Sequence, residues 1–191
     1  MRANSKPDRP VSLPPIVALT GFMAAGKSTV GRALGNLLRW NFFDLDYEIE
    51  CREGLRVREI FARHGELRFR QLETDALHSV LERALAPTVI ALGGGTFVET
   101  RNASLLRAYQ ARVVFLEIAV EHLLQRCRAA SVRCPENPRP LAEDEDAFYA
   151  LHAQRLPSYR QAELIVNTTA MTAEQVAGEI VAGLRLTLSN P

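Results

Sequence analysis

Short apolar runs alternate with amphipathic stretches along most of this chain. Apolar runs of about four to eight residues are typical of strands buried on both faces, whereas apolar residues three and four positions apart are typical of helices that bury one side. Strands are predicted at 16–19, 41–44, 88–91, 112–116 and 163–166. Helices are predicted at 29–39, 47–51, 57–64, 66–85, 103–109, 120–128, 145–155 and 172–188. This alternation predicts one three-layer α/β domain over residues 16–188, with helices on both faces of a five-stranded parallel sheet.

Two segments interrupt the alternation. Residues 1–15 hold several prolines and charges but no apolar cluster, so we expect a disordered lead-in. Residues 129–144 show no periodicity and contain Pro135, Pro138 and Pro140. This stretch is long for a connection inside a compact domain, and long loops of this kind often act as lids over active sites. We therefore predict a mobile lid at 129–144.

The connection after the first predicted strand carries a complete phosphate-binding pattern. Residues 21–28 read Gly-Phe-Met-Ala-Ala-Gly-Lys-Ser, which fits G-x-x-x-x-G-K-[ST]. In such a loop backbone N–H groups surround phosphate oxygens, the lysine reaches the β- and γ-phosphates, and the serine hydroxyl binds Mg²⁺. A glycine-bearing turn can match by chance, but here a strand precedes the loop and a helix follows it, which places an anion at the helix N-terminus. The sequence predicts a nucleoside triphosphate site at Lys27 and Ser28.

A pair of aspartates follows the second predicted strand. Asp44 and Asp46 point to the same side if the extended geometry continues past the strand. The carboxyl ends of parallel strands meet at one edge of the sheet, so both carboxylates are predicted to face the nucleotide. Asp46 also suits the N-cap of the helix that begins near Tyr47, and one role does not exclude the other.

Two further features are candidates for the acceptor side. Arg70 and Glu73 are three residues apart in a predicted helix and are therefore neighbours on one face. Their spacing alone favours a solvated ion pair over a binding role. The glycines at 93–95 follow the third strand and allow the backbone to turn sharply or to approach a ligand closely, although a turn alone would also use them.

Composition narrows the choice of partners. Lys plus Arg number 23 against 22 acidic residues, a net charge of +1 that gives no reason to expect a nucleic acid. No run reaches the ~18 apolar residues of a membrane span, so no membrane partner is expected. Cys51, Cys127 and Cys134 show neither metal-binding nor disulfide spacing and are expected to be reduced thiols of a cytoplasmic protein. Lys27 is the only lysine besides Lys6, which excludes the guanine-reading [NT]-K-x-D motif of GTPases.

A phosphate loop is shared by ATPases and small-molecule kinases, so other polar groups must decide between them. Phosphoryl transfer to a small alcohol needs a carboxylate at the attacking hydroxyl, cations for the migrating charge, an acceptor pocket and a lid that excludes water. Asp46, Lys27 with Mg²⁺, the glycine turn and the predicted lid supply these groups. Arg70 and Arg155 add bidentate donors that suit a carboxylate on the acceptor.

Taken together, the motifs resemble the shikimate kinase family over residues 16–184. They follow the phosphate loop in the family's order: Phe43-Asp44-x-Asp46-x-x-Ile49-Glu50, Phe69-Arg70-x-x-Glu73, Gly93-Gly94-Gly95, Arg139-Pro140-Leu141, and Arg155 with Pro157 and Tyr159. The resemblance implies a P-loop kinase fold with sheet order 2-3-1-4-5. It also implies transfer of the γ-phosphate of ATP to the 3-hydroxyl of shikimate, a step of aromatic amino-acid biosynthesis. The expected partners are ATP, shikimate and Mg²⁺, and we expect a monomer.

The resemblance implies a role for each site residue. Asp46 would orient the acceptor hydroxyls and act as the base, with Lys27 and the lid arginine Arg139 as the other catalytic groups. Mg²⁺ would be held by Ser28 and, through water, by Asp44. The residues implied to hold shikimate are Asp46, Arg70, Gly94 and Arg155. Those implied to hold the nucleotide are Ala24, Ala25, Gly26, Lys27, Ser28, Thr29 and Arg139.

Two features depart from the family pattern. Ala24 stands where the family usually has glycine, a change that we expect to have little effect because the general phosphate-loop pattern accepts any residue there. The lid is also longer than usual between Arg126 and Arg139, so the arginine on the adenine side is either Arg126 or Arg128.

Two alternative functions are consistent with parts of the sequence. A kinase for another hydroxylated acid, such as gluconate, would share the phosphate loop but not the arrangement of Arg70 and Arg155. A non-catalytic sensor of shikimate or nucleotide would not need Lys27, Asp46 and Arg139 together.

Overall fold

The structure, a computed structural model, describes residues 14–133 and 143–187. Its strands are β1 (Ile16–Thr20), β2 (Asn41–Asp44), β3 (Thr88–Ala91), β4 (Arg112–Glu117) and β5 (Leu164–Asn167). Its helices are α1 (Lys27–Leu38), α2 (Leu45–Glu53), α3 (Val57–Arg83), α4 (Thr100–Ala108), α5 (Val120–Arg133), α6 (Glu145–Tyr159) and α7 (Ala173–Gly183), with the short 3-10 helix η1 (Thr96–Val98). The alternation of strands and helices predicted from the sequence is confirmed.

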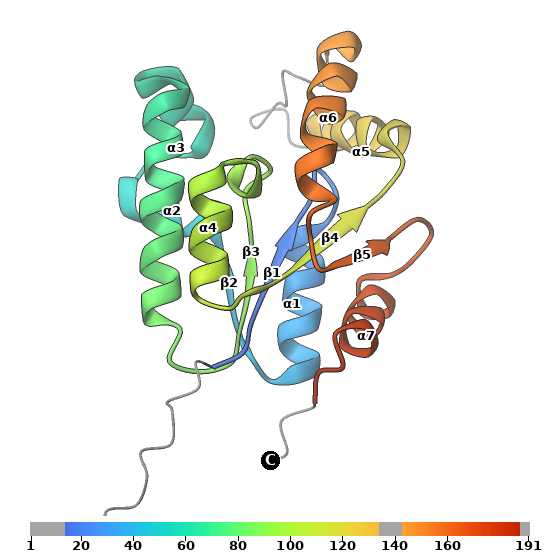
Figure 1. The fold of residues 1–191 in the computed structure, drawn as a ribbon. Coiled ribbons are helices and arrows are strands. Elements are labelled where there is room, and N and C mark those ends of the chain that lie inside the picture. The colour runs from blue at the N-terminus through green and yellow to red at the C-terminus, as the bar shows by residue number, and fades with distance from the viewer. Residues whose placement is uncertain (1–13, 134–142, 188–191) are drawn as a thin grey trace, which may run out of the picture.

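The strands form one five-stranded sheet in the order β2-β3-β1-β4-β5, as the family resemblance implies. Each neighbouring pair is parallel, with β1 at the centre paired to β3 on one side and β4 on the other. The chain moves outward from β1 in both directions, so the loop after β1 lies at the point where the strand order reverses. Open parallel sheets bind ligands at such a switch point, outside the carboxyl ends of the strands. The phosphate loop occupies this position (Figure 1).

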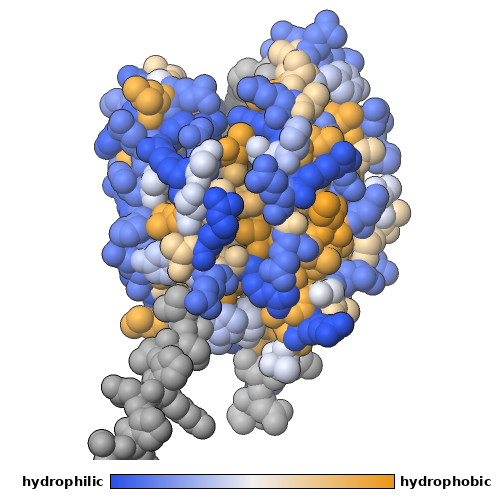
Figure 2. Space-filling model, viewed as in Figure 1, coloured by the Kyte–Doolittle hydropathy of each residue, from blue (hydrophilic) through white to orange (hydrophobic). Residues whose placement is uncertain are grey.

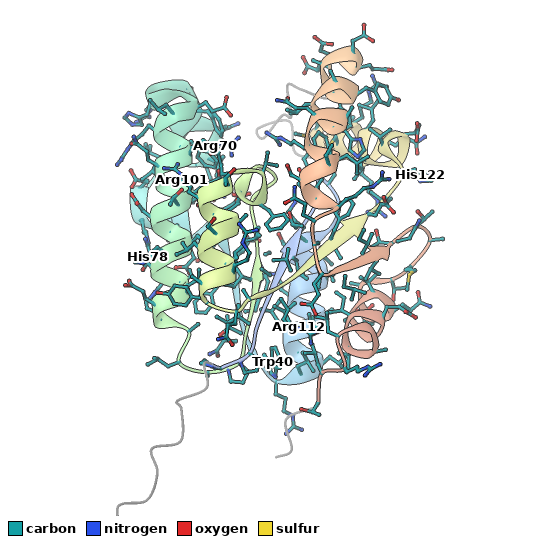
Figure 3. All side chains as sticks on the ribbon, viewed as in Figure 1. Trp40, Arg70, His78, Arg101, Arg112 and His122 are labelled. Atoms are coloured by element: carbon teal, nitrogen blue, oxygen red, sulfur yellow. The ribbon has the colours of Figure 1, made fainter. Side chains whose placement is uncertain are left out.

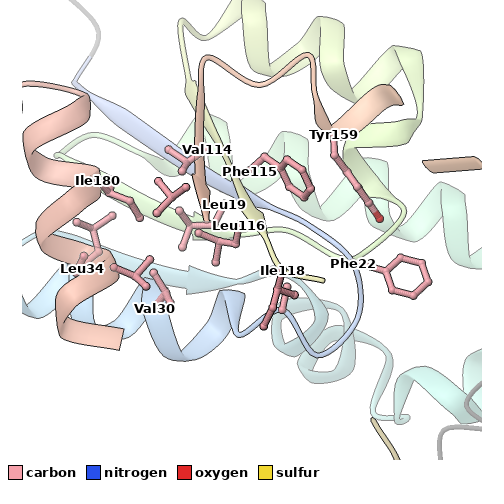
Figure 4. Close-up of a cluster of buried hydrophobic side chains, with 14 of the residues drawn as sticks. Leu19, Phe22, Val30, Leu34, Val114, Phe115, Leu116, Ile118, Tyr159 and Ile180 are labelled. Carbon is pink, nitrogen blue, oxygen red and sulfur yellow. The ribbon is translucent and has the colours of Figure 1, made fainter. Parts of the chain in front are cut away.

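Alternate residues of the central strand enter two separate hydrophobic cores. Val17 and Leu19 pack into a core with side chains of α1, α5, α6 and α7 (Figure 4). Ile16 and Ala18 pack into the opposite core with side chains of α2, α3 and α4. Both faces of the sheet are therefore covered, which explains why its strands are continuously apolar rather than alternating.

Two predicted boundaries near the lid are wrong. The lid was predicted from residue 129, but α5 continues to Arg133 because Ala129 and Ala130 are strong helix formers, and the Ser131 hydroxyl donates to the Cys127 carbonyl 3.2 Å away. Helix α6 was predicted to end at residue 155, but it continues through Pro157 to Tyr159. Pro157 removes one hydrogen bond near the end of the helix, and the fully buried side chain of Tyr159 holds the last turn in place.

Helix ends elsewhere follow local backbone chemistry. Gly54 ends α2 with a φ of 64°. Gly65 interrupts α3 with a φ of 75°, which confirms the predicted break between the helices at 57–64 and 66–85. Helix α7 ends at Gly183 rather than at residue 188. Arg185 just beyond it has a φ of 51°, which turns the chain out of the helix. Within the described residues no helix is long and apolar enough to cross a bilayer.

Candidate active site

A cleft of about 1100 Å³ lies at the carboxyl edge of the sheet. Its walls come from the phosphate loop, α2, α3, the glycine turn after β3, α5 and α6. The space-filling view shows the surface notched between the upper end of α3 and α6 (Figure 2). Most of the predicted site residues line this one cleft: Ala24, Gly26, Lys27, Ser28, Thr29, Asp44, Asp46, Arg70, Gly94 and Arg155. Residues separated by more than a hundred positions in the chain are thus brought to one surface.

The phosphate loop ends where α1 begins. Gly26 is the N-cap of α1 with a φ of 91°, a conformation that favours glycine. No side chain caps this end and no acidic residue lies in the first turn, so its backbone N–H groups and dipole favour an anion. The Lys27 ammonium lies across the loop and donates to the carbonyls of Gly21 at 2.8 Å and Phe22 at 3.0 Å. Lys27 is therefore held at the mouth of the anion site.

Two alanines of the loop differ in position. Ala24 lines the cleft and has a φ of 61°, in the left-handed region that disfavours residues with a Cβ. The glycine usual in the family would adopt this conformation without the Cβ clash. Ala25 has a buried side chain, and its N–H donates to the Phe22 carbonyl at 3.2 Å. Ala25 thus closes the loop from inside rather than presenting its side chain to the cleft.

The two aspartates divide the roles that the sequence left open for them. Asp44, not Asp46, is the N-cap of α2, and its carboxylate accepts a hydrogen bond from the Tyr47 N–H at 3.4 Å. Helix α2 begins at Leu45, one residue after the strand, so the cap falls two residues earlier than predicted. Asp46 lies in the first turn of the helix and lines the cleft. Its carboxylate is therefore available to a ligand.

The environment of Asp46 changes its acidity. Asp46 is exposed to solvent on the wall of the cleft, and nearby protein atoms desolvate its carboxyl group in part. This desolvation is the main cause that raises the pKa of Asp46 to about 6, while Lys27 opposes the rise and the carboxylates of Asp44 and Glu73 add to it. A carboxyl group with a pKa near neutrality is suited to general base catalysis.

Arg70 and Glu73 form a buried ion pair, so the prediction of a solvated pair is wrong. The Glu73 side chain is only 1% exposed, and its Oε2 accepts a hydrogen bond from Arg70 Nη1 at 2.5 Å. Its other oxygen, Oε1, accepts one from the Thr96 hydroxyl at 2.7 Å. Thr96 lies just after the glycine turn, which could not be foreseen from helix spacing. Figure 3 labels Arg70 near the upper end of α3.

The glycine turn allows these charged groups to approach the backbone. A Cβ on Gly95 would lie 2.4 Å from Arg70 Nη1, and one on Gly93 would lie 2.4 Å from Glu73 Oε1. Both glycines therefore leave room for a side chain of the site. The turn therefore does more than reverse the chain, because it lets two side chains of the cleft lie against the backbone.

Arg155 closes the cleft from α6. It is half-buried, and its guanidinium carbon lies 5.9 Å from the centre of the Phe22 ring. Tyr159, one helical turn further along, donates from its hydroxyl to the Gly94 carbonyl. Burial raises the pKa of Tyr159 to about 12, so the hydroxyl keeps its proton at neutral pH. Sequence reasoning gave no role to Tyr159, which ties α6 to the glycine turn.

Two arginines of α5 were candidates for the nucleotide side. Arg126 lines the cleft, and its Nη1 donates to the Ala24 carbonyl at 3.4 Å. Arg128 instead pairs with Glu145 at 2.5 Å. The predicted lid arginine, Arg139, and Cys134 lie outside the described residues. Neither Cys51 nor Cys127 is in a disulfide in the described part of the chain.

The donors available for Mg²⁺ are oxygen atoms. Ser28 and Asp44 both line the cleft, and hydroxyl and carboxylate oxygens are ligands that Mg²⁺ prefers. Across residues 14–133 and 143–187, no three His, Cys, Asp or Glu side chains gather into a metal-binding group. This arrangement fits a cation held by one or two protein oxygens together with substrate phosphates and water, the usual mode for Mg²⁺.

Comparison with known proteins identifies the family. A model of the shikimate kinase family matches residues 23–185. The chain belongs to the shikimate kinase family. A shikimate kinase of Geobacter metallireducens is 41% identical over 167 residues, which cover 86% of this chain and 88% of that protein.

Solved structures agree with the family assignment. A shikimate kinase of Acinetobacter baumannii in complex with shikimate has a TM-score of 0.79 at 33% identity, covering 92% of this chain and 97% of the other. One from Aquifex aeolicus has a TM-score of 0.77 at 33% identity, covering 89% and 96%. The protein is therefore an ATP-dependent enzyme of this family with the P-loop kinase fold, and both alternative functions are set aside.

Proposed function

We propose that the cleft transfers the γ-phosphate of ATP to the 3-hydroxyl of shikimate, with the phosphate loop as the donor side and Asp46, Arg70, Gly94 and Arg155 as the acceptor side. One observation carries the proposal. A single cleft holds a phosphate loop, a carboxylate of raised pKa and two half-buried arginines on opposite walls. A hydrolase of ATP alone would have no use for the acceptor groups.

Arg70 and Arg155 recognise the carboxylate of the acceptor. They reach the cleft from α3 and α6, which belong to opposite cores of the molecule. A guanidinium offers two parallel N–H donors to a carboxylate, which fixes its orientation as well as its position. A Cβ added to Gly94 would lie 3.6 Å from Arg155 Nη1, which is an ordinary contact distance. The backbone of Gly94 can therefore close the pocket around the ring of shikimate.

Asp46 orients the hydroxyl and accepts its proton. As the 3-hydroxyl oxygen forms a bond to the γ-phosphorus, the bond from phosphorus to the bridging oxygen of the β-phosphate breaks and ADP leaves. The hydroxyl proton passes to the Asp46 carboxylate, so charge and atoms balance. Lys27 and the amides at the start of α1 stabilise the negative charge on the transferred group.

Mg²⁺ fits the donor set of the cleft. Ser28 and Asp44 supply the hydroxyl and carboxylate oxygens that would hold the ion, and the family resemblance implies that Asp44 would act through water. The ion would neutralise charge on the β- and γ-phosphates. On the nucleotide side Arg126, which donates to the Ala24 carbonyl of the phosphate loop, suits the adenine side better than Arg128, which pairs with Glu145, and the family resemblance would place Arg139 at the phosphates.

The remaining assignments concern the whole chain. We propose that residues 16–188 form one kinase domain that acts as a monomer. Light scattering on the purified protein tests this assignment. The spacing of the three cysteines, which fits neither a metal site nor a disulfide framework, is the observation behind our assignment of the enzyme to the cytoplasm.

Conservative substitution of Arg70 and Arg155 tests whether they belong to the acceptor side of the cleft rather than to the nucleotide side. Arg70→Lys and Arg155→Lys each keep the charge but lose the bidentate fork. We expect KM for shikimate to rise about tenfold to a hundredfold, which corresponds to one charge-assisted hydrogen bond of roughly 1.5–3 kcal/mol. KM for ATP is expected to stay within about twofold, because the donor side is untouched.

Arg160→Lys is the matched control. Arg160 lies just beyond α6 on the surface, where it pairs with Glu117 at 3.3 Å, and the substitution is expected to leave both KM values unchanged. If instead ATP binding weakened in Arg70→Lys or Arg155→Lys while shikimate binding did not, the acceptor assignment would be wrong.

A further inference from the structure

Arg70 already holds a carboxylate on one of the two forked edges of its guanidinium. The Oε1 atom of Glu66 accepts hydrogen bonds from Arg70 Nε at 3.2 Å and from Arg70 Nη2 at 2.9 Å. Glu66 lines the cleft and comes directly after the break of α3 at Gly65. The Nε and Nη2 atoms form one of the two forked edges of a guanidinium, so Glu66 occupies a bidentate site.

The rest of the Arg70 guanidinium is also occupied by neighbouring groups of the protein. Glu73 accepts from Nη1, and Gly95 packs against the guanidinium so closely that a Cβ there would lie 2.7 Å from Arg70 Cζ. Arg70 with Glu66 and Glu73 carries a net charge of −1. With Arg155 on the opposite wall the charges of the four groups sum to zero, so an incoming anion meets no net positive charge while both carboxylates remain on Arg70.

The two carboxylates differ in how easily they leave. Glu73 is 1% exposed and also accepts from Thr96, so its departure would leave a buried charge without a partner, which is strongly unfavourable. The Glu66 side chain is 67% exposed, and water can replace Arg70 around it. Exposed ion pairs of this kind contribute little to stability. Glu66 is therefore the group that an acceptor can displace.

We propose that Glu66 is an internal competitor of the substrate: it holds the Nε and Nη2 edge of Arg70 until the carboxylate of shikimate replaces it. The inference rests on the proposed role of Arg70 in binding that carboxylate. Before the substrate binds, Glu66 keeps the Arg70 guanidinium aligned between Glu73 and Gly95. The exchange also excludes ligands that lack a carboxylate, because only an anion can take the place of Glu66 on Arg70. Its consequence is a weaker apparent affinity for the acceptor than Arg70 alone would give.

Glu66→Gln tests the exchange because it keeps the shape of the side chain and removes its charge. We expect KM for shikimate to fall about twofold to fivefold, the range of an exposed ion pair, with kcat and KM for ATP unchanged. Calorimetric titration with shikimate is expected to show the same gain in affinity without any turnover. Glu82→Gln is the matched control: Glu82 lies on the same helix, is 57% exposed and pairs with His78 outside the cleft, so KM should not change.

The same substitution in an Arg70→Lys background separates displacement from a general effect of charge. Lysine keeps the charge of Arg70 but has no forked edge, so Glu66→Gln is expected to lose its effect on KM there. A KM that is unchanged or raised by Glu66→Gln, or lowered equally in both backgrounds, would overturn the inference. If Arg70→Lys itself left KM for shikimate unchanged, the proposed role of Arg70 would fail instead, and that outcome is seen independently of Glu66.

Discussion

Asp46 is the residue whose chemistry depends most on its surroundings. The pKa of an aspartate in water is about 4. The protein atoms around Asp46 raise the pKa of its carboxyl group to about 6. The spacing of Asp44 and Asp46 in the sequence indicates a shared edge of the sheet, but the pKa depends on Glu73 and Lys27, which reach the cleft from other elements.

Asp46→Asn removes the base while keeping the size of the side chain. We expect kcat to fall by about 10² to 10⁴, the usual range for a positioned acid–base group, with little change in KM for ATP. In the free protein the carboxyl carbon of Asp46, assigned by its loss in this variant, should titrate in NMR spectra with a midpoint near pH 6. An unchanged kcat would remove Asp46 from the chemistry, and a midpoint near the ordinary value of 3.8 would contradict the desolvated environment.

Ala24 adopts a backbone conformation that costs free energy. A residue with a Cβ in the left-handed region is destabilised by about 1–2 kcal/mol, and glycine avoids this but loses roughly 0.4–1 kcal/mol through its more flexible unfolded chain. Ala24→Gly is therefore expected to raise the free energy of unfolding by about 0.5–1 kcal/mol in urea titrations without nucleotide. Ala153→Gly, at an exposed position inside α6, should lower it by about 1 kcal/mol. Equal destabilisation by both changes would show that the φ of Ala24 is not a source of strain.

The glycines of the turn at 93–95 leave space for Arg70 because they have no side chains. Gly95→Ala would place a Cβ 2.4 Å from Arg70 Nη1, and the end of the arginine side chain must move. We expect KM for shikimate to rise at least tenfold while the free energy of unfolding changes by less than about 1 kcal/mol, because a flexible side chain rather than backbone gives way. Gly178→Ala in α7, where a Cβ meets nothing within 4 Å, is the control and should stabilise the protein slightly without changing KM. A large loss of stability in Gly95→Ala without a rise in KM would show that the turn serves folding alone.

Elements with a strong apolar pattern could be predicted closely, and their ends less so. Strand β3 begins and ends where the sequence predicts, because its four residues are all buried. The end of α5 could not be seen because its last residues, including Ala129 and Ala130, are helix formers without an apolar stripe. The extension of α6 past Pro157 depends on Tyr159, whose hydrogen bond to Gly94 joins two parts of the chain that only the fold brings together.

At the scale of the whole molecule, the cleft exists because the strand order reverses at β1. The phosphate loop lies at that reversal, α3 delivers Arg70 from one core and α6 delivers Arg155 from the other. The motifs could be found in the sequence because each one is local. The distances between these motifs and the burial of Glu73 could not, because they arise only when the sheet has assembled.

The most direct test of the account is a screen of acceptors with the purified protein and MgATP. ADP formation is measured with shikimate, quinate, gluconate or no acceptor, and the phosphorylated product is located by ³¹P and ¹H NMR. The account predicts rapid ADP formation with shikimate alone and a phosphate on its 3-hydroxyl. ADP formed equally well without an acceptor, or faster with gluconate, would contradict it.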